Sequence, residues 1–508
     1  MSEQPSESPV SHPGFTDLLQ VLNGGNAHDP SRWVYANRSL RMDLIEVIGF
    51  DMDYTLAMYR KHAIESLAAE ATIDKLIDAG YPDSLRKIEY DDGFVIRGLA
   101  VDKRHGNLFK MDKHRHVTRA FHGFEPLDKS ARRRVYRAET IRLSAPRYHL
   151  IDTLFGLPEA YLYAAIVDLF EREGRRNPDY AGIFKDIRSA IDVAHQDGSI
   201  KRTVLADVER FIVSDPELAP TLHKFRSAGK RLFLLTNSYF TYTQALMSHL
   251  FDGTMPEYPS WRHYFDLICV GAKKPGFFTL RTPFREVDPR TGEAGADARG
   301  PMERGKIYEG GCATHLQRNL KASADRILYV GDHIYGDVLR AKKTSAWRTA
   351  MVIQEMRREL EIREGQSKLL EELVRLESRR MEIDAEIARD QATLRALQKI
   401  CEAGLDHYSA PERQAITEAH RRARGALEGD RRALRKVLDD HATLDQNLDR
   451  AYNPHWGPLF KDGVEHSVFG GQVEDYACLY TSHVSNFLGY SPTGYFRAPR
   501  DRMPHEHR

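Results

Sequence analysis

The feature that most constrains the fold is a set of three short apolar runs, each followed by a cluster of polar side chains. The runs cover residues 46–50, 231–235 and 326–330. Short runs without polar alternation are typical of strands that are buried on both faces. Helical patterns at 217–228 and 313–324 precede the last two runs. Strands that alternate with helices predict an α/β fold with a doubly wound parallel sheet.

The polar clusters all follow the carboxyl ends of these predicted strands. They are Asp51–Asp53, Thr236–Ser238 and Asp332–Asp337. In open parallel sheets, ligands bind in the crevice beyond the carboxyl ends of the strands. The order of the sequence therefore predicts that the three clusters meet in one site.

The spacing of the runs predicts several domains in this chain of 508 residues. Residues 51–230 separate the first two runs, which is far more than one crossover connection needs. We expect an inserted cap domain with helices near 158–173 and 180–195. The predicted organisation is a disordered leader at 1–30, a discontinuous catalytic core, a cap or substrate-specificity region at 61–204, a helical hairpin at 354–450 and a C-terminal tail at 491–508. The core would comprise residues 31–60, 205–353 and 452–490.

The segment 354–450 differs from the rest because it carries a heptad pattern. Positions 369, 373, 376, 380, 383, 387, 390, 394, 397 and 401 are spaced alternately by four and three residues, and most are apolar. This pattern predicts a coiled-coil-like helix. Gly404 and Pro411 separate it from a second charged helix, so we expect a hairpin arm. The seam could meet another protein, or the second helix could cover it within one chain.

Composition excludes several classes of protein. The 74 basic and 73 acidic residues give a net charge of +1, which provides no general basis for binding nucleic acid or a membrane. The four cysteines form no CxxC or Cys/His cluster, which argues against a zinc site and favours a reducing, cytoplasmic compartment. No apolar run is long enough for a membrane span, and residues 1–14 lack the apolar core of a signal peptide.

The chemistry is predicted from the polar clusters. Asp51 and Asp53 are two residues apart after a strand, so that one carboxylate can attack phosphorus while the other transfers protons. A carboxylate that attacks a phosphate dianion needs a cation to offset the repulsion, and Mg²⁺ prefers oxygen ligands. Asp332 can supply a further ligand, and Asp337 can hold metal-bound water.

A phosphoryl group also needs donors around it. Thr236 and Asn237 can donate hydrogen bonds, and Lys274, which precedes Pro275, can neutralise charge. Each feature alone has an ordinary structural explanation, because paired aspartates often cap helices and a Lys-Pro pair often forms a surface turn. Their occurrence together, each at a strand end, favours a catalytic site.

These motifs resemble those of the haloacid dehalogenase superfamily. Three stretches extend the likeness to the cytosolic purine 5′-nucleotidases, which prefer IMP and GMP: GFDMDYTLA at 49–57, DTLFGLPE at 152–159 and YEGG at 308–311. The resemblance implies Mg²⁺-dependent hydrolysis of purine nucleoside 5′-monophosphates through an aspartyl-phosphate, with phosphotransfer to a second nucleoside as an additional activity. It covers most of residues 34–350 and the chain after 452, and fits worst over the helical hairpin.

The resemblance also implies roles for individual residues. Asp51 would be the nucleophile and Asp53 the general acid/base, and Mg²⁺ would bind Asp51, the main-chain carbonyl of Asp53, and Asp332. Phosphate would bind the side chains of Thr236, Asn237 and Lys274. The purine nucleotide would contact residues of the cap and one core serine: Phe155, Arg188, Asp192, His195, Lys201 and Ser238. Arg188, Asp192 and His195 also share one helix face by spacing, although an ordinary surface ion pair explains the first two equally well.

Relatives in this family are tetramers that nucleotides such as ATP activate, so the resemblance implies a homo-oligomer, either tetramer or dimer. Asp152, Tyr335 and Lys343 match positions near the effector site of such relatives. Two alternatives remain open at this stage. The chain could be another phosphatase or phosphotransferase of the superfamily that acts on a different nucleotide or a sugar phosphate. It could also be a non-catalytic scaffold that works through the helical arm.

Overall fold

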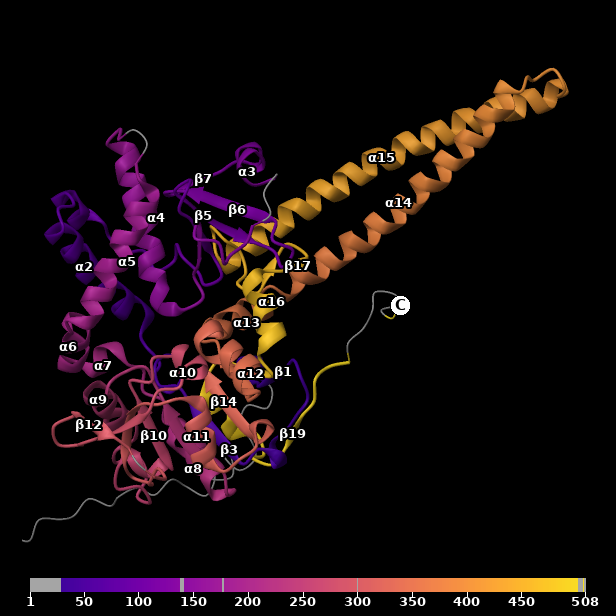
Figure 1. Cartoon of the computed structure of the whole chain (residues 1–508). Coiled ribbons are helices and arrows are strands. Elements are labelled where there is room, and N and C mark those ends of the chain that lie inside the picture. The colour runs from indigo at the N-terminus through magenta and orange to yellow at the C-terminus, as the bar shows by residue number, and fades with distance from the viewer. Residues whose placement is uncertain (1–28, 138–140, 176–177, 299, 501–505, 507–508) are drawn as a thin grey trace, which may run out of the picture. The chain divides into compact units, whose positions relative to one another are not determined.

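The computed structural model describes residues 29–137, 141–175, 178–298, 300–500 and Glu506. Its largest element is a ten-stranded sheet in the order β1-β18-β15-β14-β3-β9-β10-β13-β11-β12 (Figure 1). The strands are β1 Tyr35–Ala36, β3 Val47–Phe50, β9 Arg231–Leu235, β10 Leu267–Val270, β11 Phe284–Val287, β12 Ala294–Asp297, β13 Ile307–Gly310, β14 Ile327–Gly331, β15 Arg348–Val352 and β18 Leu479–Thr481.

The centre of this sheet is parallel. Every neighbouring pair from β18 to β13 is parallel, while β1, β11 and β12 pair antiparallel at the edges. The three predicted apolar runs form β3, β9 and β14, which lie side by side in the order β14-β3-β9. The structure thus confirms the predicted parallel α/β sheet and brings the three polar clusters to one edge.

The helices of this part connect the strands. α8 and α11 precede β9 and β14 as predicted, and α16 precedes β18, so the chain after the arm returns to the sheet. The helices are α8 Leu218–Ser227, α9 Phe240–Phe251, α10 Gly276–Thr279, α11 Ala313–Leu320, α12 Arg340–Ser345, α13 Glu355–Gly365 and α16 Val468–Tyr476. A π-helical turn at Ile334–Leu339 follows the end of β14.

Close packing beneath the strand ends explains one glycine of the first motif. Phe233 of β9 and Val47 of β3 belong to the buried core that also holds Tyr329 and Trp347. A Cβ atom on Gly49 would lie 2.0 Å from Cζ of Phe233. No larger residue fits there without displacing that ring, so Gly49 allows β3 to lie against β9 just before Asp51.

The cap contains a second sheet that the sequence analysis missed. Its strands run antiparallel in the order β7-β6-β5-β4-β8. They are β4 Ala100–Asp102, β5 Asn107–Met111, β6 Val117–His122, β7 Glu125–Pro126 and β8 Tyr148–Leu150. All five residues of β5 are buried, including Asn107 and Lys110, so the alternation that predicts a half-exposed strand is absent.

The predicted cap helices are present together with others. They are α2 Lys61–Asp78, α3 Lys129–Tyr136, α4 Leu157–Arg172, α5 Tyr180–Gln196, α6 Ser199–Ala206 and α7 Val208–Phe211. The cap and the large sheet belong to one compact unit, which comprises residues up to Arg358 and from Leu459 onward.

The second compact unit is Glu359–Pro458, where the sequence analysis drew boundaries at 354 and 450. In it α14 (Ser367–Glu402) and α15 (Ala410–Tyr452) pack against each other as a hairpin (Figure 1). Ile383 and Leu427 of the two apolar stripes are buried. A capping box between Ser409 and Glu412 begins α15. The seam of α14 therefore faces α15 within the chain, with Ile383 buried and most of the other seam positions half-buried.

The two ends of the chain differ in how much of them the structure describes. Most of the predicted leader lies outside the described residues. The first part of the predicted tail forms β19 (Tyr495–Phe496), which pairs with β2 (Leu40–Arg41).

The four cysteines are unpaired, and three of them are buried. Among the described helices, none combines the length and the apolarity that crossing a membrane requires.

Candidate active site

The carboxyl ends of β3 and β14 bring three aspartates together. Asp51 follows β3, Asp332 follows β14, and Asp337 lies in the π-helical turn. One carboxylate oxygen from each lies within 4.8 Å of the others, and all three residues are buried. A Cβ atom on Gly331 would lie 2.8 Å from Cβ of Asp337, so the glycine before Asp332 makes room for the third carboxylate.

Lys274, which comes shortly after β10, is the cation of this cluster. Its Nζ lies 2.8 Å from Oδ1 of Asp51 and 2.7 Å from Oδ1 of Asp337. It also donates to the hydroxyl of Tyr329 at 3.0 Å. Burial alone would lower the pKa of Lys274, but the carboxylates of Asp337 and Asp51 raise it above its usual value. Lys274 is therefore a fixed positive charge beside Asp51.

One lysine does not balance three buried carboxylates. Burial raises the pKa of Asp51 well above its usual value, and Lys274 offsets this only in part. Burial, followed by the charge of Asp337, raises the pKa of Asp332 to about 7. In the described part of the chain, Oδ2 of Asp332 is buried without a hydrogen-bond partner. A buried carboxylate oxygen of this kind fits a hard divalent cation such as Mg²⁺.

The three aspartates are not equivalent as ligands. Oδ1 of Asp337 accepts from Lys274 and Tyr329, and its Oδ2 accepts from the main-chain N–H of His333. Protein donors thus occupy both oxygens of Asp337, in keeping with the supporting role predicted for it. The carboxylates of Asp51 and Asp332 fit direct ligands, while Asp53 could contribute only its main-chain carbonyl, because its carboxylate is engaged elsewhere.

The carboxylate of Asp53 is held by hydroxyl groups. Tyr59 donates to Oδ1 at 2.6 Å, and Ser238 donates to Oδ2 at 2.9 Å. The Tyr59 hydroxyl also lies 2.9 Å from that of Tyr242. Ser238, predicted as a substrate contact, therefore orients the predicted acid/base.

The two predicted phosphate donors on the β9 loop are also engaged with the protein. Asn237 accepts from the main-chain N–H of Lys274 at 2.6 Å and donates to its carbonyl at 3.1 Å. The hydroxyl oxygen of Thr236 accepts from the N–H of Ser238 at 3.0 Å. In this arrangement the side chain of Asn237 holds the loop that carries Lys274. Asn237 therefore serves the site more by positioning Lys274 than by direct contact with phosphate.

Some predicted nucleotide contacts gather beside Asp53. The ring of Phe155 lies 4.7 Å from that of Tyr54 and 6.0 Å from those of Tyr59 and His195, measured between centroids. Nζ of Lys201 lies 5.2 Å from the centre of the Tyr242 ring. Burial lowers the pKa of His195, with a further contribution from Lys201. These residues form an aromatic and basic wall next to Asp53.

Arg188 and Asp192 are both exposed, and their charged groups lie 3.7 Å apart, which matches the ordinary ion pair of neighbouring helical turns. The closer partner of Arg188 is Glu159 of α4, whose Oε2 lies 2.7 Å away. Glu159 is buried, and burial raises its pKa despite Arg188. The structure thus adds a carboxylate to this pair that the sequence analysis missed.

The three residues of the predicted effector site have separate partners. Oδ2 of Asp152 lies 3.1 Å from Nε2 of His333, an ion pair without good hydrogen-bond alignment. The guanidinium of Arg340 lies 4.6 Å from the centre of the Tyr335 ring. Nζ of Lys343 lies 5.0 Å from the ring of Tyr476. Within the described residues, no hydrogen bond, ion pair or ring contact joins Lys343 to Asp152 or Tyr335.

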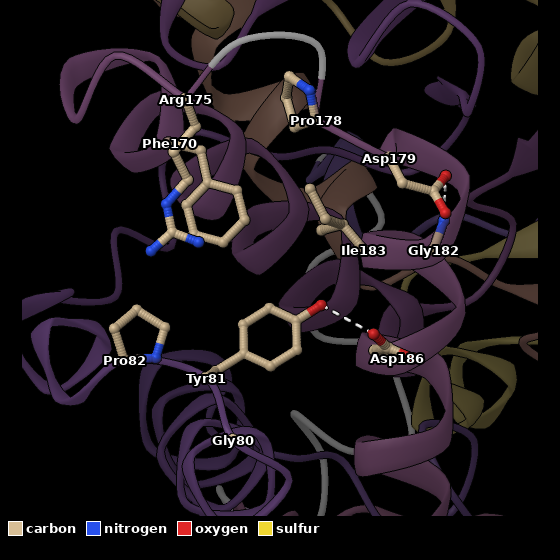
Figure 2. A pocket seen from close by; sticks show the side chains of 10 residues that line it. All are labelled: Gly80, Tyr81, Pro82, Phe170, Arg175, Pro178, Asp179, Gly182, Ile183 and Asp186. Carbon is tan, nitrogen blue, oxygen red and sulfur yellow. Dashed lines mark hydrogen bonds between the residues drawn. The ribbon is translucent and has the colours of Figure 1, made fainter.

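A separate cavity of about 440 Å³ lies in the cap (Figure 2). Tyr81 and Phe170 face it with nearly parallel rings, and the Tyr81 hydroxyl donates to Asp186 at 2.9 Å. None of the predicted catalytic, metal or nucleotide residues lines it. The predicted site at the strand ends therefore lies apart from this cavity.

Sequence reasoning missed several residues that shape the site. Tyr59 donates to Asp53, and Tyr329 contacts both Lys274 and Asp337. Arg97 donates to the main-chain carbonyl of Asp332. The hydroxyl of Tyr329 in an otherwise apolar run was a signal that could have been used. Arg97 stands alone in its segment, and only the tertiary structure reveals its partners.

Comparison with known proteins agrees with this geometry. The model of the 5' nucleotidase family matches residues 34–508. A 5'-nucleotidase domain-containing protein of Dictyostelium discoideum is 28% identical over 482 residues, covering 93% of this chain and 74% of that protein. The 5'-nucleotidase domain-containing protein 2 of Rattus norvegicus is 29% identical over 486 residues, covering 93% and 80%. The human protein of that name is 27% identical over 485 residues, covering 93% and 85%. The chain therefore belongs to the 5' nucleotidase family and is a phosphate-monoester hydrolase.

Proposed function

We propose that the protein hydrolyses purine nucleoside 5′-monophosphates, with IMP and GMP as preferred substrates, through a phosphorylated Asp51 and with Mg²⁺. The observation that carries the chemistry is the position of Lys274 Nζ, 2.8 Å from Asp51 within a buried cluster of three aspartates. A buried carboxylate beside a fixed cation is arranged for attack on an anionic group. Mg²⁺ bound by Asp51 and Asp332 would offset the remaining negative charge.

The first step follows from the partners of Asp51. Lys274 and the main-chain N–H of Met52 both bind Oδ1, so we assign the attack to Oδ2. Oδ2 forms a bond to phosphorus as the bond from phosphorus to the 5′ oxygen of the nucleoside breaks. Asp53 donates its proton to that leaving oxygen. The hydroxyl groups of Tyr59 and Ser238 can donate or accept, so they can hold Asp53 in both protonation states.

The second step returns the enzyme to its starting state. Asp53, now ionised, takes a proton from water as the water oxygen attacks phosphorus and the bond to Asp51 breaks. Inorganic phosphate leaves, and Asp53 keeps the proton for the next turnover. If the hydroxyl of a second nucleoside replaces water, the same step gives phosphotransfer.

The aromatic wall supports a nucleotide as the substrate. Phe155, Tyr54 and His195 lie beside Asp53, where a nucleoside attached to the leaving oxygen has to sit. The exposed Arg188 with Glu159 and Asp192 offers donors and acceptors for the edge of a purine. A sugar phosphate has no base to stack on these rings, whereas another nucleotide would stack there too, so the choice among nucleotides depends on the substrate panel.

A substrate panel tests this proposal. Phosphate release should be measured with Mg²⁺ on IMP, GMP, AMP, pyrimidine monophosphates, a sugar phosphate and p-nitrophenyl phosphate. We expect the highest kcat/KM for the 6-oxopurine nucleotides. A sugar phosphate or a pyrimidine nucleotide as the best substrate would contradict the proposed specificity while leaving the phosphatase chemistry intact.

Replacing Phe155 with alanine should impair purine monophosphates selectively. Stacking of a base on an aromatic ring contributes about 1–3 kcal/mol, and only a substrate with a base can use it. We therefore expect kcat/KM for IMP to fall about tenfold or more, with little change for p-nitrophenyl phosphate. Equal losses on both substrates would show that Phe155 only packs against Tyr54. Phe155→Tyr is the matched control, because it keeps the ring and should retain most of the activity.

Shortening the helical arm should leave the basal reaction unchanged. Every residue assigned to the site lies in the other compact unit, and the two helices of the arm pack on each other. We expect a variant in which a short Gly/Ser turn replaces residues 382–430 to keep its Mg²⁺-dependent activity. Light scattering, and activity with and without ATP, would show whether the arm supports a homo-oligomer or a response to a nucleotide effector. Loss of basal activity in a folded variant would contradict the separation of arm and site.

A further inference from the structure

Arg97 joins the cap to the end of the strand that carries Asp332. Its side chain is 0% exposed. Nη1 donates to the main-chain carbonyl of Asp332 at 3.0 Å. Nε and Nη2 donate to the two carboxylate oxygens of Glu355 at 2.7 and 2.6 Å. The guanidinium also lies 4.9 Å from the centre of the Phe469 ring. One buried side chain thus contacts the residue that follows β14, the first residue of α13 and an aromatic ring of α16.

Among the described contacts, Arg97 makes no hydrogen bond to the carboxylate of Asp332, although its charge acts to lower the pKa of that group. An arginine beside an aspartate commonly forms a bidentate pair with it, and such a pair would occupy the oxygens that a metal needs. Here Glu355 takes the bidentate position, and Oδ2 of Asp332 has no hydrogen-bond partner within the described chain. The arrangement leaves Asp332 available as a cation ligand while its main chain is held.

We propose that Arg97 and Glu355 act together as a positioning pair for the metal site. Arg97 anchors the main chain of Asp332, and Glu355 keeps the guanidinium away from the Asp332 carboxylate. This inference rests on the proposed Mg²⁺-dependent function and adds two residues to it that none of the sequence motifs contains.

Packing around the pair limits how far Arg97 can move as a whole. The next residue, Gly98, has a φ of 85°, and a Cβ atom there would lie 2.7 Å from Cβ of Phe469. Its N–H donates to the carbonyl of Ile151 at 2.7 Å. Because the backbone is held in this way, the guanidinium can change partners mainly by rotation of the side chain.

This geometry predicts that substitution of Glu355 lowers the affinity of the site for a divalent cation. In Glu355→Ala, two guanidinium donors lose their partner. Arg97 already binds the main-chain carbonyl of Asp332, so Oδ2 of the same residue, which has no hydrogen-bond partner among the described residues, becomes an acceptor for them. Arg97 would then compete with the cation. We expect the affinity for Mn²⁺, used as a probe for Mg²⁺, to fall about tenfold or more, the range found for partners that surround metal ligands.

The double variant Arg97→Met/Glu355→Ala separates this competition from a general structural effect. With the guanidinium removed, Asp332 has no competitor, so Mn²⁺ affinity should recover part of the loss seen in Glu355→Ala. A merely structural pair would show the opposite, because a second buried substitution would add to the damage. Asp266→Ala is the matched control: it removes the partner of Arg226 at 2.9 Å and of the main-chain N–H of Leu232 at 2.8 Å, and neither of these residues belongs to the proposed metal site.

Mn²⁺ binding should be measured by electron paramagnetic resonance on chelator-treated full-length protein, with thermal melting to confirm folding. Weaker binding in Glu355→Ala, recovery in the double variant and no change in Asp266→Ala would support the proposal. Unchanged binding in Glu355→Ala, or a double variant no better than Glu355→Ala, would overturn it. Absence of Mn²⁺ binding by the unmutated protein would instead overturn the metal-dependent function on which it rests.

Discussion

Phosphate release from every substrate is expected to vanish when Asp51 is replaced by asparagine. The amide has nearly the same shape as the carboxylate but cannot act as the nucleophile. Losing a nucleophile that works as one unit with its neighbours costs on the order of 10⁵-fold in kcat. The measurement is phosphate release with Mg²⁺ at saturating IMP, together with the test for a phosphorylated protein after rapid acid quenching. We expect the unmutated enzyme to carry acid-stable, base-labile phosphate and Asp51→Asn to carry none.

The fold of this variant should be intact. Asp51 is buried among like charges, and burial raises its pKa, so removing its charge relieves an unfavourable interaction in the metal-free protein. Its melting temperature without metal should therefore be no lower than that of the unmutated chain. Phosphate release above a trace level in a folded Asp51→Asn protein would exclude the covalent mechanism. Asp53→Asn is the informative companion, because it should form phosphoenzyme slowly from a substrate with a good leaving group.

Replacing Asp332 with asparagine is expected to raise the requirement for metal. Oδ2 of Asp332 is buried and has no hydrogen-bond partner among the described residues, and the amide supplies no negative charge to a cation there. Loss of even a supporting group near a bound metal costs about 10–100-fold in affinity, so we expect at least that much for a direct ligand. The measurements are activity against Mg²⁺ concentration and Mn²⁺ binding to the protein without substrate.

The matched control for this variant is Asp337→Asn. Protein donors occupy both oxygens of Asp337, so its substitution should disturb Lys274 and lower kcat with a smaller change in the metal requirement. A metal titration of Asp332→Asn that matches the unmutated enzyme would remove Asp332 from the ligand set. Equal shifts in both variants would show instead that the cluster binds metal as one unit.

The amino-acid sequence by itself determined the parallel core and the order of its motifs. Short apolar runs such as Val47–Phe50 can be stable only when they are buried on both faces, and helices between them leave few ways to connect the strands. Because parallel strands share a carboxyl edge, the aspartates that follow β3 and β14 had to meet. The meeting of these aspartates was therefore predictable without knowledge of any distance.

The arm was predictable for a similar reason. A heptad repeat is a local pattern that identifies a helix and its apolar face before any partner is known. Which surface covers that face is not local information. The structure decided it by packing α15 on α14 within the chain.

Only the tertiary structure decided the parts of the site that distant segments share. The fully buried β5 has no alternation to reveal it, so the cap sheet was missed. Glu159 reaches Arg188 from another helix, and Arg97 meets Glu355 across more than half of the chain. A single arginine or glutamate has no periodicity, and its partner depends on which surfaces pack together. Strand ends follow from local apolar patterns, whereas the buried ion pairs that hold their side chains in place follow from the complete three-dimensional fold.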